Sequence, residues 1–75
     1  MDLKMFIDCF ADEFDETDRD EFTPTTIFKD LEEWDSLTSL SVITMIDEQM
    51  EVRIKGSDLR SCDTIEDLYK LASDV

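Results

Sequence analysis

Glycine and proline are almost absent from this chain, which has one of each in 75 residues. Neither interrupts residues 36–50, and Asp35 stands immediately before that run. Aspartate is a strong N-cap because its carboxylate accepts hydrogen bonds from backbone N–H groups two or three residues on. We therefore expect a long helix that Asp35 opens and that ends at about Met50. No segment has the alternation of a strand, and no internal repeat is present.

A first helix is predicted over about residues 2–14, where apolar side chains fall on one helical face. Those side chains are Leu3, Phe6, Ile7, Phe10 and Phe14. A last helix is predicted from the capping-box pattern that begins at Thr64, with Asp67 in place of the usual Glu. Its apolar face would consist of Ile65, Leu68, Tyr69 and Ala72.

The remaining segments are expected to be a short helix and two connections. Ser57 to Arg60 resembles the start of a short helix, and Gly56 suits a turn before it. Residues 15–34 are expected to form a long loop, which begins with an acidic run and contains Pro24. A loop of this length in a compact domain is usually functional or disordered. Apolar anchors favour order, and these are Ile27, Phe28 and Leu31.

The predicted fold is a small all-α bundle of four helices, three main and one short, with a long loop between the first two. We expect a single domain over residues 1–75. The hydrophobic fraction of 41% is too high for a disordered acidic tail. A domain of this size buries only about 60% of the surface that its unfolded chain exposes. It has no room for a deep catalytic cleft and a scaffold.

The net charge of −14 restricts the possible partners. Phosphate contacts need Lys and Arg, so we expect no binding to nucleic acid, and an anionic membrane surface is disfavoured for the same reason. A partner with a basic surface is favoured, because opposite fields steer encounter; solubility alone is the other explanation of the charge.

No apolar leader or membrane-length segment is present, and we expect a monomer in the cytoplasm.

Catalytic and metal-binding chemistry has little support in this sequence. The chain has no histidine, which excludes Ser-His-Asp and Cys-His arrangements. Cys9 and Cys62 match no zinc or redox spacing; we expect reduced thiols, with a single long-range disulfide as the alternative. The acidic loop lacks the EF-hand pattern. We therefore expect neither an enzyme nor a dedicated metal site.

Ser36 is the remaining candidate for chemistry, because it would occupy the first position of the second helix. A phosphate attached there would meet the positive end of the helix dipole and unsatisfied N–H groups. A contribution to capping alone is the other interpretation. Successive helical residues turn by about 100°, which directs Leu37 away from the core face, and Met45 is also expected off that face. An exposed Leu beside an exposed Ser indicates a docking surface.

The run from Phe28 to Leu37 contains the Asp-Ser-Leu motif, and with the helix order and acidity it resembles the acyl carrier protein family. The resemblance covers nearly the whole chain. It implies that Ser36, between Asp35 and Leu37, receives 4′-phosphopantetheine from coenzyme A through a separate phosphopantetheinyl transferase. The chain would then carry acyl groups as thioesters, without being an enzyme, for fatty acid, lipid or polyketide biosynthesis. Its partners would be acyl-transferring and condensing enzymes with basic docking surfaces.

The resemblance also implies two groups of contact residues. Partners would dock on Leu37, Thr38, Ser41, Met45, Asp47 and Glu48. An acyl chain would fold back between the second and third helices, against Phe28, Ile43, Ile46, Leu59, Cys62 and Leu68. Plain core packing is the other interpretation of the second group, and both can hold.

The chain departs from the family pattern near the motif. Glu32-Glu33-Trp34 fills a stretch where the family often has Gly, and Thr38 and Ser41 stand where many fatty-acid carriers have acids. A dedicated set of partners is therefore expected. Two alternatives remain open: a carrier of aminoacyl or peptidyl groups that uses the same serine, and an acidic protein-binding module without a prosthetic group.

Overall fold

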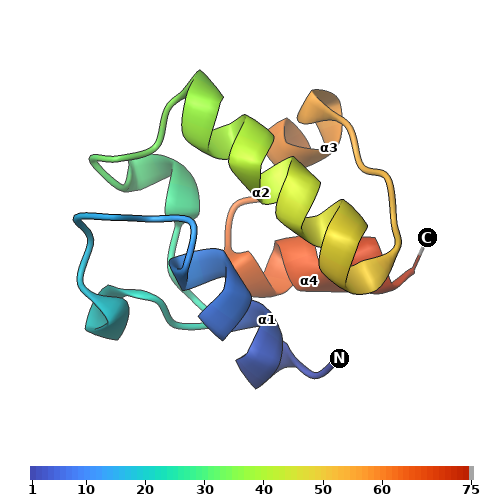
Figure 1. Ribbon diagram of the computed structural model, residues 1–75, viewed down its shortest axis with the longest axis horizontal. Helices are drawn as coiled ribbons and strands as arrows, with labels where there is room; N and C mark the ends of the chain where they lie inside the picture. Colours follow the sequence, from blue (N-terminus) through green and yellow to red (C-terminus); the bar gives the residue numbers. More distant parts are fainter. Residues whose placement is uncertain (75) are drawn as a thin grey trace.

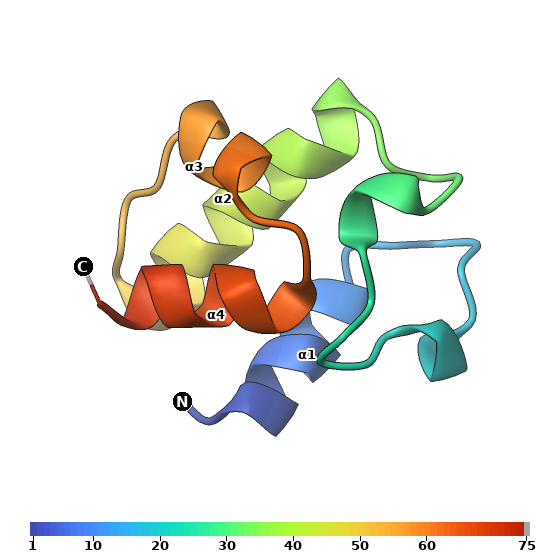
Figure 2. The ribbon, with the colours of Figure 1, turned by 180° about the vertical axis from the view of Figure 1, so that it is seen from behind.

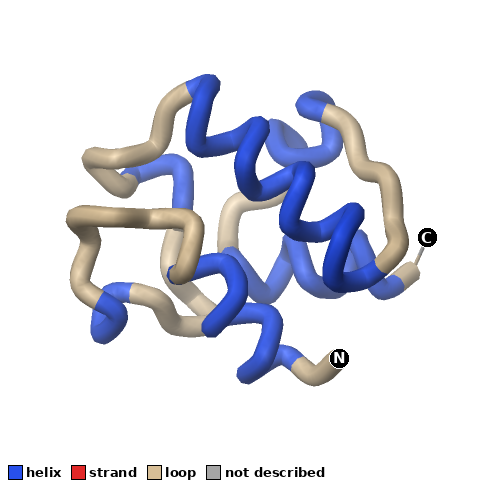
Figure 3. Tube along the Cα trace, in the orientation of Figure 1, coloured by secondary structure: helices blue, strands red, loops and turns tan. Residues whose placement is uncertain are grey.

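The computed structural model describes residues 1–74, and within them it contains helices and loops but no strand (Figure 1, Figure 3). Four α-helices and two 3₁₀ turns follow one another along the chain. They are α1 (Leu3–Ala11), η1 (Arg19–Glu21), η2 (Phe28–Asp30), α2 (Ser36–Met50), α3 (Gly56–Ser61) and α4 (Ile65–Ser73). The predicted all-α bundle with three main helices, one short helix and a long first connection is confirmed.

Helix α2 is the longest element and crosses the front of the bundle, where it contacts each of the other three helices (Figure 1). It begins where the sequence predicted, because Asp35 Oδ1 accepts a hydrogen bond from the Thr38 backbone N–H at 2.7 Å. It ends at Glu51, whose backbone is left-handed with φ 57° and ψ 38°. Glu51 is therefore the residue that reverses the chain, whereas Gly56 has no positive φ and opens α3. The predicted turn at Gly56 was wrong.

Helix α4 begins at its predicted cap. The Thr64 hydroxyl accepts from the Asp67 N–H at 3.1 Å, and the Asp67 carboxylate accepts from the Thr64 N–H at 3.2 Å. This reciprocal capping box fixes the start of α4. Helix α1 stops at Ala11, earlier than predicted, although Phe14 beyond it is still buried.

Aromatic side chains fill the centre of the molecule. Phe10 is fully buried, and other rings from α1, the long connection and the residue before Asp35 surround it. Ring centroids 5.4 to 6.4 Å from that of Phe10 belong to Phe6, Phe14, Phe22, Phe28 and Trp34. Burial of a phenylalanine side chain stabilises the folded state by roughly 1.5–3 kcal/mol. This cluster therefore makes a large contribution to the folding free energy of a small domain.

The long connection between α1 and α2 is ordered by contacts with distant parts of the chain. Its backbone carbonyls at Thr26 and Pro24 accept from the N–H groups of Ile65 and Glu66 at 3.1 Å each, which ties it to the start of α4 (Figure 2). Phe28 is a fully buried anchor, as predicted. Ile27 is 47% exposed, so its predicted role was wrong.

Two features explain how the connection packs instead. The backbone of Ile27 forms an isolated bridge with Thr64, which leaves its side chain outside. Phe22, which the sequence analysis did not select, is only 6% exposed and takes the place of the missing anchor. Leu31, the third predicted anchor, is half-buried and packs against the core.

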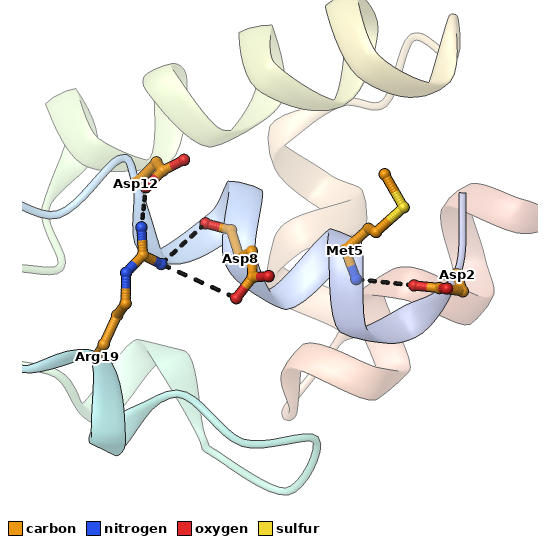
Figure 4. A network of polar contacts seen from close by, with 5 residues as sticks. All are labelled: Asp2, Met5, Asp8, Asp12 and Arg19. Carbon is orange, nitrogen blue, oxygen red and sulfur yellow. Dashed lines mark hydrogen bonds and ion pairs between the residues drawn. The ribbon is translucent and has the colours of Figure 1, made fainter.

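Polar contacts at α1 complete the framework. In Figure 4, Arg19 of η1 reaches back to α1, where its guanidinium bonds the Asp8 carbonyl at 3.3 Å and pairs with the Asp12 carboxylate. At the other end of α1, the Asp2 carboxylate accepts from the Met5 N–H at 2.8 Å and caps the helix (Figure 4).

None of the helices within residues 1–74 combines the length and the hydropathy that a membrane span requires.

Candidate functional site

Ser36 differs from every other hydroxyl residue of α2. It is exposed at the first position of the helix, and its hydroxyl takes part in no hydrogen bond within residues 1–74. The other hydroxyls of α2 all donate to backbone carbonyls at 2.9 to 3.2 Å. They belong to Thr38, Ser39, Ser41 and Thr44. Ser36 is therefore the hydroxyl on α2 that is free to react.

Asp35 fixes the position of Ser36. Its carbonyl accepts the first helical bond, from the Ser39 N–H at 2.9 Å, while its carboxylate caps Thr38. The hydrogen bond from the Thr38 backbone lowers the pKa of the Asp35 carboxyl below its usual value. The cap is therefore ionised at neutral pH, and it complements the positive end of the α2 dipole.

Glu33 connects this site to the long connection. Its carboxylate accepts from the backbone N–H groups of Asp15 and Glu16 at 3.0 and 2.7 Å. It also accepts from the Thr17 hydroxyl, and this bond is the main cause that lowers the pKa of Glu33. On the other side, the Glu33 carbonyl accepts from the Thr38 hydroxyl at 2.9 Å. No local pattern signals this role, because the donors lie 16 to 18 residues away.

The predicted docking residues do not all share one surface. Four of the six line a hollow of about 300 Å³ between α2 and Glu13, which follows α1, namely Leu37, Ser41, Met45 and Glu48. The other two, Thr38 and Asp47, are half-buried and do not line it. Leu37 is 73% exposed, as predicted.

Two corrections apply to this surface. Met45 is only 6% exposed, so its predicted exposure was wrong. It follows Val42 by three residues, which places the two about 60° apart on the helical wheel, and Met45 is therefore at the edge of the core face. Leu40, which the sequence analysis passed over, is 58% exposed and lines the same hollow as Leu37. Its spacing of three residues from Leu37 was the available signal.

The predicted acyl-pocket residues lie mostly in the packed core. Five of them are at most 4% exposed: Phe28, Ile46, Leu59, Cys62 and Leu68. Ile43 is half-buried and packs against them. Burial raises the pKa of the Cys62 thiol, and both cysteines are free thiols. Of the predicted group, Leu59 lines a small open cavity.

That cavity measures about 100 Å³ and lies where η2, α2 and α3 meet. Its lining consists of Lys29, Trp34, Ser39, Gly56, Leu59 and Arg60. Sequence reasoning missed five of these six residues as pocket residues, because they come from three separate segments. Within residues 1–74, no group of three or more His, Cys, Asp or Glu side chains is placed to hold a metal ion.

The site thus presents an exposed, unbonded serine hydroxyl at the start of a capped helix, next to exposed leucines. This arrangement suits a small domain that is modified on a side chain and recognised by other proteins. The family described as phosphopantetheine attachment site matches residues 6–72, and the chain belongs to this family. Searches of the curated proteins and of the solved structures gave no significant match.

Membership in this family establishes the general role of the domain. The family attaches 4′-phosphopantetheine covalently, its carrier domains are modified by phosphopantetheinyl transferases, and they interact with partner enzymes. The residues at the start of α2 fit such a group. Ser36 is exposed, its hydroxyl has no competing hydrogen bond within the described chain, and the N-terminus of α2 favours a negative charge.

Proposed function

We propose that this protein is an acyl carrier protein in which Ser36 bears the 4′-phosphopantetheine group. The observation that supports the assignment is the free hydroxyl of Ser36 in a helix whose other hydroxyls are all bonded to backbone carbonyls. In the modification, the Ser36 Oγ–P bond forms as a P–O bond of the coenzyme A pyrophosphate breaks. Adenosine 3′,5′-bisphosphate leaves, and the hydroxyl proton goes to a base of the transferase. The attached group then supplies a thiol that holds acyl cargo as a thioester.

The protein's own residues position and present this group. Asp35 caps the helix and so holds Ser36 at its first turn. Leu37 and Leu40 offer apolar contact beside it, and the net charge of −14 attracts a basic partner surface over a distance. We infer a cytoplasmic monomer that serves acyl-transferring and condensing enzymes of fatty acid, lipid or polyketide biosynthesis. The protein itself catalyses no step.

A modification assay tests the proposal directly. The purified protein is incubated with coenzyme A and a broad-specificity phosphopantetheinyl transferase, and the adduct is mapped by mass spectrometry. We expect one phosphopantetheine group on the wild type and none on Ser36→Ala. Ser57→Ala is the matched control, because Ser57 is also exposed, lies in the first turn of a helix and has no side-chain hydrogen bond within the described residues.

The possible failures have different meanings. If the wild-type protein stays unmodified, the carrier proposal is wrong, and the alternative of an acidic protein-binding module stands. If the adduct persists in Ser36→Ala and is absent in Ser57→Ala, the attachment residue is Ser57 in α3. A carrier of aminoacyl or peptidyl groups would give the same mass result, so cargo class needs a separate observation.

A further inference from the structure

The hydroxyl of Ser36 has no hydrogen bond within residues 1–74, so its position depends on the backbone on either side of it. On the helical side, the Asp35 cap and the bond from the Ser39 N–H to the Asp35 carbonyl hold the first turn. Both bonds lie within one turn, and the ends of helices fray. The segment before Asp35 is therefore needed to tie the start of α2 to the rest of the domain.

Residues 31–34 form a turn that leads into α2. The Trp34 N–H donates to the Leu31 carbonyl at 3.0 Å and closes this turn. The Trp34 ring packs edge-on against Phe28, with ring centroids 4.9 Å apart, and it stacks with Phe10 at 6.4 Å. An aromatic side chain therefore anchors the turn to the core.

Glu33 anchors the same turn through polar contacts. Its carboxylate receives two backbone N–H groups and one hydroxyl from residues 15–17, at distances of 2.6 to 3.0 Å. Hydrogen bonds to an ionised acceptor are roughly twice as strong as neutral ones, so three donors on one carboxylate make a firm contact. The Glu33 carbonyl in turn accepts from the Thr38 hydroxyl at 2.9 Å. The long connection is thereby joined to the first turn of α2.

The adjacent carboxylate shows that this contact belongs to one position. Glu32 carries the same charge and is exposed, but its side chain has no hydrogen bond within residues 1–74. In a chain with a net charge of −14, a further acidic side chain adds to self-repulsion unless it has specific partners. The donors at residues 15–17 are such partners for Glu33, and the bond from Thr17 is the main cause that lowers its pKa.

We propose that Glu33 is a positioning residue for the attachment of the phosphopantetheine group to Ser36. The inference rests on the proposed function and names a further residue for that reaction. Glu33 acts through Thr38 and the backbone of the turn, which it holds so that the start of α2 does not fray. A restrained Ser36 brings its Oγ into line with the phosphorus atom more often, and small misplacements of a reacting atom reduce a rate by large factors.

The experiment measures kcat and KM for modification by a phosphopantetheinyl transferase, with the carrier as the varied substrate and coenzyme A saturating. Glu33→Gln removes the charge and keeps the size of the side chain, and Glu32→Gln is the matched control. We expect Glu33→Gln to lower kcat roughly three- to tenfold, a range that the loss of a hydrogen bond to a charged group allows. KM should change by less than about twofold, because the docking side chains are untouched. Glu32→Gln should retain both wild-type values.

A purely structural role of Glu33 would give a different result. If Glu33→Gln only increased the unfolded fraction, less substrate would be available, and the apparent KM would rise while kcat at saturation stayed the same. Hydrogen exchange supplies an independent readout of fraying. The N–H groups of Thr38 and Ser39 should exchange faster in Glu33→Gln, whereas the Leu68 N–H, which bonds the Thr64 carbonyl in α4, should be unchanged.

Thr17 provides a second test, because its hydroxyl reaches the same carboxylate from the long connection. Thr17→Val keeps the shape of the side chain and removes the hydroxyl, so it should also lower kcat. Thr17→Ser keeps the hydroxyl and should retain the wild-type kcat. In the double variant Thr17→Val/Glu33→Gln the two losses should not add, because both substitutions remove the same contact.

Four results would overturn the inference while leaving the carrier function in place. They are an unchanged kcat in Glu33→Gln, an equal loss in Glu32→Gln, a change confined to KM, and the same kcat in Thr17→Val and Thr17→Ser. Absence of any modification of the wild type would instead contradict the proposed function itself.

Discussion

The Glu33 carboxylate accepts a hydrogen bond of 2.6 Å from the hydroxyl of Thr17, which lies 16 residues earlier in the chain. The same carboxylate accepts two backbone N–H groups of the long connection, and the Glu33 carbonyl accepts from Thr38 in the first turn of α2. One residue therefore joins the beginning of the connection to the helix that presents Ser36. Its side chain accepts these hydrogen bonds most strongly while it is ionised.

We expect Glu33→Ala to lower the melting temperature at pH 7 by a few degrees. The pKa of Glu33 in the folded protein is below 4.5, its value without these contacts. The stabilisation is therefore complete above pH 4.5 and is lost as the pH falls through the folded pKa. Melts of wild type and variant from pH 7 to pH 3 should converge at the acid end. Glu32→Ala is the control, because Glu32 is an exposed neighbour that has no side-chain hydrogen bond within residues 1–74. An equal fall in Glu32→Ala would refute the role of Glu33.

Glu13 should show the opposite dependence on pH. Burial raises its pKa above 4.5, and the negative charges of Asp12, Glu48 and Asp15 raise it further. Protonation of Glu13 therefore stabilises the fold fully below pH 4.5, and this contribution is lost as the pH rises through the folded pKa. We expect Glu13→Gln to raise the melting temperature at pH 7 by about 1–3 °C and to reduce the gain that the wild type shows on mild acidification. Glu32→Gln, which removes the same charge elsewhere, should retain that gain.

Glu51 holds a left-handed backbone at the end of α2, with φ 57°. For residues other than Gly this conformation costs roughly 1–2 kcal/mol, and a negative charge near a helix C-terminus is also unfavourable. We expect Glu51→Gly to increase the free energy of unfolding by about 1 kcal/mol in urea denaturation. Glu51→Gln removes the charge and keeps the strain, so it should gain only a few tenths of a kcal/mol. Equal gains in both variants would show that charge, and not backbone strain, is the cause.

Partner contact on α2 should depend more on Leu37 and Leu40 than on charge. Both side chains are more than half exposed, so Leu37→Ala and Leu40→Ala should leave the melting temperature nearly unchanged. Burial of a Leu side chain is worth roughly 1.5–3 kcal/mol, so each variant should lower kcat/KM for modification by about tenfold or more. Met5→Ala on α1, also exposed, should have little effect.

Measuring kcat/KM for modification at low and high salt distinguishes apolar contact from electrostatic steering. Higher ionic strength should slow encounter for the wild type and the leucine variants alike, because it screens the acidic surface. Asp47→Asn should cause a smaller loss than Leu37→Ala at either salt concentration. If Asp47→Asn strongly lowers kcat/KM for modification while Leu37→Ala leaves it unchanged, partners recognise α2 by charge.

The parts of the fold that the sequence predicted are those set by neighbouring residues. Asp35 caps Thr38 three residues on, and Thr64 and Asp67 cap each other over the same spacing. Such contacts are formed within one turn, so residue type and spacing are enough to infer them. The position of Ser36 at the start of α2 was predictable for this reason.

The parts that the sequence missed depend on segments far apart in the chain. Glu33 could not be distinguished from Glu32 until the connection was placed beside it. Ile27 was expected inside, but its backbone pairs with Thr64, and Phe22 fills the core instead. The cavity beside Arg60 likewise needs three segments to meet. The spacing of apolar residues in the sequence indicates which face of a helix is buried, but it does not indicate which loop covers that face.

The unbonded hydroxyl of Ser36 affects how partner enzymes could distinguish the unmodified protein from the modified one. Attachment of a group at this oxygen breaks no hydrogen bond within the described chain and leaves the Asp35 cap in place. If the group is attached there as proposed, these hydrogen bonds at the start of α2 are the same in the empty and the modified state. Partners that act in order would then recognise the appended arm and its cargo, because the start of α2 offers them the same backbone in both states.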